Sequence, residues 1–106
     1  MKLLILFAAA LLEAGGDALV RQGLRNSGTA RGILLALGAV VLFSYGYAVN
    51  APNWDFGKLL GVYVVFFFLV AQIVAWLVFH ERPGNAVLIG GAFVVTGGLI
   101  ISFGSR

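Results

Sequence analysis

The chain has 106 residues, of which 61% are hydrophobic and only 10% are charged, and its mean hydropathy is +1.04. Soluble domains average about 45–50% apolar and roughly 25% charged residues, so this composition excludes an ordinary soluble domain. The net charge of +3 reports on loop charges in such a chain and does not indicate nucleic-acid binding. With no cysteine, the chain has no disulfide framework, thiolate nucleophile or cysteine metal site.

Four apolar segments follow one another along the chain, at residues 3–20, 32–49, 59–79 and 86–103. Each approaches the roughly 20 residues that a helix needs to cross a hydrocarbon layer about 30 Å thick. The stretches between them are rich in glycine, asparagine, proline and charge, which indicates loops. The uninterrupted apolar runs lack the alternation of a β-barrel. The sequence therefore predicts an all-α membrane protein, with a single four-helix transmembrane domain covering residues 1–106.

The first segment also has some features of a secretory signal peptide: Lys2, an apolar core, and small residues at 14–16. The apolar run continues past that cleavage point, so we interpret it as the first membrane helix.

Glu13 lies inside this first apolar segment. A charged side chain at the centre of a membrane helix costs about 2.5–3.5 kcal/mol on insertion scales, so its presence indicates a functional site. Its helical face holds small side chains, which leave room for a ligand or another helix.

Low-dielectric surroundings disfavour the ionised form of a carboxylate. A proton and a cation can therefore compete for Glu13, as in a proton-coupled exporter. A structural acid that is hydrogen-bonded to Ser44 or Tyr45 would leave the same sequence pattern.

Asp17 and Arg21 continue the stripe of Glu13, four and eight residues further on. Two interpretations of Asp17 stay open. It pairs with Arg21 near the membrane surface, with the arginine extending to the headgroups, or it binds a ligand or a proton directly.

The third and fourth segments carry weaker signals. Tyr63 has an aromatic face that can stack on a cation, although aromatic residues in such a segment also pack or contact lipid. The fourth segment contains a strip of small residues suited to close helix packing, within a subunit or in a dimer. These residues are Gly90, Gly91, Gly97, Gly98 and Gly104.

The distribution of basic residues gives little orientation bias. Four spans place Lys2, Lys58 and Arg106 on one side, against the arginines at 21, 25, 31 and 82 on the other. Under the positive-inside rule, so small a difference is compatible with a single orientation or with dual insertion. Dual insertion would permit an antiparallel dimer.

The chain resembles the small multidrug resistance family of the drug/metabolite transporter superfamily, as a divergent member. The resemblance rests on Glu13 followed eight residues later by Arg21, on "WLVFHERP" at residues 76–83, and on "IGGAFVVTGGLIIS" at residues 89–102. It implies a four-helix subunit acting as a dimer in the bacterial inner membrane, with two Glu13 carboxylates in a shared vestibule. It also implies proton-coupled export of quaternary ammonium, guanidinium or polyamine cations, with Tyr63 at the place of a site-lining tryptophan and Arg21, Ser44 and Tyr45 in support.

Two features depart from that family. Asp17 is an additional acid, and the third segment reads "LLGVYVVFF" where the family has a pair of helix-kinking glycines.

Two other functions remain as alternatives. The segment 80–105 is also similar to small subunits proposed to flip lipid-linked aminoarabinose, which work as unlike pairs but do not have a membrane glutamate as their hallmark. A non-transporting membrane protein that only assembles with a partner would need no more than the glycine strip.

No residue set indicates an enzyme or a cofactor site, and His80 beside Glu81 is interpreted as a solvated turn. Four helices are too few to enclose a water-filled path, so we expect a homodimer or a paired heterodimer.

Overall fold

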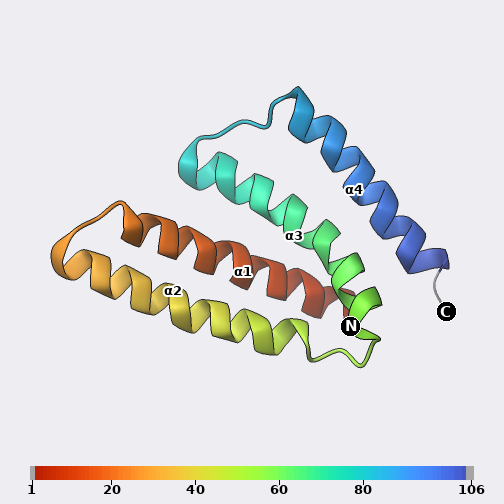
Figure 1. The fold of residues 1–106 in the computed structure, drawn as a ribbon, viewed down its shortest axis with the longest axis horizontal. Coiled ribbons are helices and arrows are strands. Elements are labelled where there is room, and N and C mark those ends of the chain that lie inside the picture. Colours follow the sequence, from red (N-terminus) through yellow and green to blue (C-terminus); the bar gives the residue numbers. More distant parts are fainter. Residues whose placement is uncertain (1, 105–106) are drawn as a thin grey trace.

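The computed structural model describes residues 2–104 and contains four helices. They are α1 (Lys2–Leu24), α2 (Gly28–Val49), α3 (Phe56–Phe79) and α4 (Asn85–Gly104), drawn in Figure 1. All four are long and apolar enough to cross a membrane, and residues 2–104 contain no strand. The predicted all-α fold with four spans is confirmed.

The helices extend further than their apolar segments. The longest extensions are at the first connection, where α1 continues to Leu24 and α2 begins at Gly28. Arg25 and Asn26 donate backbone hydrogen bonds to Gln22 and Gly23, each at 3.2 Å, and so complete the last turn of α1. Gly28 then has a φ of 65°, which a residue with a Cβ rarely adopts. The predicted loop is short because polar residues outside the apolar core remain helical.

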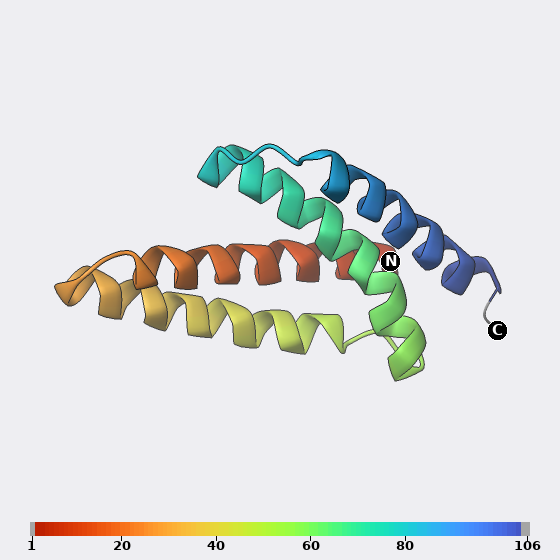
Figure 2. The ribbon, with the colours of Figure 1, turned by 45° about the horizontal axis from the view of Figure 1, so that its top comes forward.

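The helices form two antiparallel hairpins that meet through α1 and α3. The main contacts are those of α1 with α2, α1 with α3, and α3 with α4. Figures 1 and 2 show α3 crossing near the start of α1 and then diverging from it, with α4 on the far side of α3. Because the loops join neighbouring ends, the end of α1 lies at the same end of the molecule as the end of α3.

Glycines allow close approach within the first hairpin. A Cβ on Gly38 would lie 2.7 Å from Cγ2 of Val20 and 3.2 Å from the carbonyl oxygen of Gly16. A Cβ on Gly16 would lie 2.8 Å from the side chain of Leu42. These contacts leave no space for a larger side chain where α1 and α2 cross, as is common between membrane helices.

The predicted glycine strip of α4 divides into two faces. A Cβ on Gly91 or Gly98 would meet the side chains of Phe68 or Val65 of α3, so these two glycines lie at the α3–α4 contact. A Cβ at the other three positions would meet no atom within 4 Å, and these positions are Gly90, Gly97 and Gly104. The strip divides because adjacent residues on a helix point about 100° apart.

Large apolar side chains cover much of the outer surface of the helices, whereas alanines of α1 lie in the interior beside leucine, valine and tyrosine side chains. Phe43 of α2 is 78% exposed and Phe93 of α4 is 74% exposed, while Ala9 and Ala10 of α1 are fully buried. A helix that is apolar on its outer face is expected to contact lipid. The relative exposure of these large side chains therefore agrees with a membrane location.

Substitution of Gly38 tests the packing of the first hairpin. Gly38→Val should lower the free energy of unfolding by about 1–3 kcal/mol, because overpacking forces neighbours to move. Gly46→Val is the matched control on the same helix, since a Cβ at Gly46 meets no atom within 4 Å. Equal unfolding midpoints of the two variants in detergent would contradict the packing described here.

Candidate functional site

Glu13 of α1 is held by a hydrogen bond from α3. The hydroxyl of Tyr63 donates to Oε1 of Glu13 at 2.6 Å. Tyr63 is only 4% exposed, and Glu13 is partly buried. Hydrogen bonds to an ionised acceptor are short and stronger than neutral ones, and this distance lies in their range. The bond therefore ties the carboxylate to the crossing of the two hairpins.

Three aromatic rings lie around this hydrogen bond. The ring centroid of Tyr63 lies 5.6 Å from that of Tyr45 of α2 and 6.2 Å from that of Phe67, one turn further along α3. These spacings are typical of interacting aromatic pairs. Tyr63 is thus the middle ring of a row that runs from α2 to α3 beside Glu13.

Ser44 forms its side-chain hydrogen bond within α2 and not with Glu13. Its hydroxyl donates to the carbonyl oxygen of Val40 at 3.0 Å, within α2. The hydrogen-bond partner of Glu13 is instead Tyr63, 50 residues away. Sequence spacing could not identify this partner, because the contact depends on how α3 crosses α1.

Arg21 forms an ion pair with Glu81, which we expected in a solvated turn. Its Nη2 lies 3.6 Å from Oε2 of Glu81, and its guanidinium carbon lies 5.1 Å from the centre of the Phe79 ring. Both charged side chains are about half exposed, so the ion pair contributes at most about 1 kcal/mol. Within residues 2–104 Asp17 forms no ion pair with Arg21, whose carboxylate partner is Glu81.

The end of α3 explains why Glu81 points at α1. His80 ends α3 in the left-handed conformation with a φ of 59°, and the backbone N–H of Glu81 donates to the carbonyl oxygen of Ala75 at 2.9 Å. The backbone N–H of His80 donates to the same carbonyl oxygen, so the two bonds form a capping motif around a left-handed position that is usually glycine. A histidine there gave no sequence signal for the motif, and the role of Glu81 was therefore missed.

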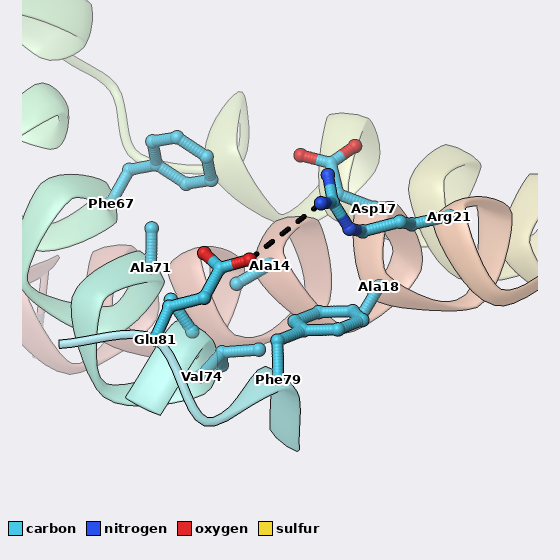
Figure 3. A pocket seen from close by; sticks show the side chains of 10 residues that line it. Ala14, Asp17, Ala18, Arg21, Phe67, Ala71, Val74, Phe79 and Glu81 are labelled. Atoms are coloured by element: carbon cyan, nitrogen blue, oxygen red, sulfur yellow. Dashed lines mark ion pairs between the residues drawn. The ribbon is translucent and has the colours of Figure 1, made fainter. Parts of the chain in front are cut away.

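A cleft lies between α1 and α3, where the two helices diverge beyond the Glu13–Tyr63 bond. Its volume is about 240 Å³, and Figure 3 shows the side chains around it. The ion pair between Arg21 of α1 and Glu81, which follows the end of α3, joins two of its lining residues. We call it the α1–α3 cleft, and its lining residues are Ala14, Asp17, Ala18, Arg21, Phe67, Ala71, Val74, Ala75, Phe79 and Glu81.

Residues 2–104 contain no cluster of side chains typical of a metal site. No group of three or more histidine, aspartate or glutamate side chains comes together in residues 2–104. Glu13 and Asp17 are the two acids of α1, one helical turn apart.

Several bacterial proteins are similar to this chain over nearly their whole length. A protein from Nocardia farcinica is 37% identical, covering 100% of this chain and 96% of the relative. A protein from Herpetosiphon aurantiacus is 32% identical, covering 92% of this chain and 89% of the relative. One from Frankia casuarinae is 35% identical, with coverage of 98% and 94%. All three are named UPF0060 membrane proteins. No solved structure matches the chain.

The family assignment agrees with these relatives. The sequence model of a family described as "Uncharacterised BCR, YnfA/UPF0060 family" matches residues 1–106. This match covers all four helices, the Glu13–Tyr63 pair and the α1–α3 cleft. The chain therefore belongs to the YnfA/UPF0060 family of membrane proteins.

Proposed function

We propose that this membrane protein exports small organic cations in exchange for protons, and that the Glu13 carboxylate is the site for which both compete. The observation that carries the proposal is the hydrogen bond from Tyr63 to Glu13, which joins two helices long and apolar enough to cross a membrane. A hydroxyl donor stabilises an ionised carboxylate without neutralising it. Within residues 2–104 no ion pair involves Glu13. Its negative charge is therefore free to bind a proton or a cation.

The aromatic surroundings favour organic cations over hydrated metal ions. Tyr45 and Phe67 flank Tyr63 beside the carboxylate. Aromatic faces attract quaternary ammonium and guanidinium groups by about 0.5–2 kcal/mol each, more strongly when the site excludes water. In this proposal Tyr63 orients Glu13 through its hydroxyl, and its ring belongs to the aromatic wall of the site. Quaternary ammonium, guanidinium and polyamine compounds are the substrate classes to test.

The sequence resemblance to the small multidrug resistance family supports the same function. It includes the two residues Glu13 and Arg21 at their eight-residue spacing, and it places Tyr63 at a site-lining position. We propose that the chain acts in the bacterial inner membrane as at least a dimer, with a second copy in antiparallel orientation or with an unlike subunit. Exchange between two arrangements of the pair would expose Glu13 alternately to each side, and a ligand drives this exchange only through different affinities for them.

Neutralising Glu13 should abolish coupled transport. In proteoliposomes with an imposed proton gradient, Glu13→Gln should reduce tetraethylammonium or guanidinium flux to the level of empty vesicles, because an amide neither releases a proton nor carries a charge. Asp55→Asn is the matched control: Asp55 precedes α3, outside the site, and its loss should leave the flux unchanged. Unchanged flux in Glu13→Gln would refute proton exchange at this residue. Movement of a labelled polyprenyl-phosphate sugar without cation flux would instead indicate a flippase.

Removing the Tyr63 hydroxyl should make protons stronger competitors of the cation. Tyr63→Phe keeps the ring but deletes a hydrogen bond to a charged group, worth about 1.5–3 kcal/mol. The apparent affinity for tetraethylammonium at neutral pH should fall roughly tenfold, and the difference from wild type should shrink as the pH rises.

Tyr47→Phe is the control for this substitution, because Tyr47 is 78% exposed and lies away from the site. Its transport should equal that of the wild type at every pH. Equal pH profiles for Tyr63→Phe and Tyr47→Phe would contradict the role given to the Tyr63 hydroxyl.

A further inference from the structure

The α1–α3 cleft lies next to the Glu13 site but does not include Glu13 among its lining residues. Asp17 follows Glu13 by four residues on α1, so their backbones are about 6 Å apart along the helix axis. Phe67 belongs to both places, because its ring stacks on Tyr63 and also lines the cleft. A ligand that leaves the cleft toward the crossing of α1 and α3 would therefore meet Glu13 next.

The charges in the cleft leave one acid without a partner. Arg21 is engaged by Glu81 at 3.6 Å and lies over the ring of Phe79. Asp17 is an exposed carboxylate on the cleft wall and takes part in no ion pair within residues 2–104. The three charged lining residues together carry one net negative charge. A monovalent cation would balance this charge.

The walls indicate what kind of cation fits. Two phenylalanine rings, Phe67 and Phe79, provide aromatic surface, and the alanines of α1 and α3 provide room between the helices. The cleft has a volume of about 240 Å³, below the roughly 300–1,000 Å³ that is typical of sites for drug-sized ligands. The space therefore suits a compact ion such as a small tetraalkylammonium or guanidinium compound better than a large polycyclic dye.

We propose that the α1–α3 cleft is a second binding site for a compact organic cation, with Asp17 as its counter-ion and Phe67 as its aromatic wall. This inference rests on the proposed function, because it takes the same substrate class, but it adds a site separate from Glu13. A cation held at Asp17 lies one helical turn from the exchanging carboxylate. The Arg21 guanidinium has Glu81 as its ion-pair partner, so Asp17 remains the acid available to a bound cation.

The test uses the full chain, purified in detergent, with tetramethylammonium as the probe and isothermal titration calorimetry at mildly alkaline pH. Glu13→Gln removes the exchanging site, so any remaining binding reports on the cleft. This variant should still bind tetramethylammonium. The double variant Glu13→Gln/Asp17→Asn should bind it at least roughly tenfold more weakly. The control Glu13→Gln/Asp55→Asn makes the same charge change outside the cleft and should bind as Glu13→Gln does.

Absence of binding to Glu13→Gln, or equal binding to the Asp17→Asn and Asp55→Asn double variants, would overturn the second site. These outcomes differ from failure of the proposed function, which would appear as wild-type flux that is independent of the proton gradient.

A substitution that changes volume but not charge gives an independent result. Ala71→Leu in the Glu13→Gln background extends a side chain from α3 into the cleft and should weaken binding of tetraethylammonium more than that of tetramethylammonium. Equal affinities for both probes before and after this change would place the bound cation outside the cleft. Melting curves of each variant in the same detergent check that the helices remain folded.

Discussion

A carboxylate within an apolar span has to be stabilised by something other than water, and the hydroxyl of Tyr63 does this for Glu13 at 2.6 Å. The same bond lies at the junction between the two helical hairpins, because α1 packs on α2 and α3 packs on α4. Hydrogen bonds between membrane helices contribute only about 0.6 kcal/mol on average. The junction therefore depends on the buried small residues of α1 as well, and the bond serves mainly to orient the carboxylate.

The size of the side chains decides where the helices touch and where they separate. Glycines at 16 and 38 bring α1 and α2 together, and those at 91 and 98 do the same for α3 and α4. The α1–α3 contact is different. The two helices diverge beyond the Glu13–Tyr63 bond, and the space between them is lined by alanines, by two phenylalanines and by the ion pair of Arg21 and Glu81. Close packing inside each hairpin and a loose junction between the hairpins together produce a fold with an accessible cleft.

The helices could be predicted from the sequence, and the contacts of the site only in part. Each apolar run is close to the length of a span, so the number of helices followed directly, although polar residues extended α1 and α2 beyond their apolar cores. Glu13 was recognisable because charge is costly in a span. Its hydrogen bond to Tyr63 was not, because the two residues are 50 positions apart and the crossing of α1 and α3 has no sequence signal. Glu81 was missed for a similar reason, since a left-handed histidine directs it toward Arg21.

Competition between a proton and a cation for Glu13 is the basis of the proposed transport. Proton release is its most direct measure. Tetraethylammonium is added to weakly buffered protein in detergent at a series of pH values, and the released protons are followed with a pH indicator dye. The account predicts that cation binding releases protons, and that Glu13→Gln releases none. Saturable binding of the cation to wild-type protein without any proton release, across the whole pH range in which the protein is folded, would contradict it.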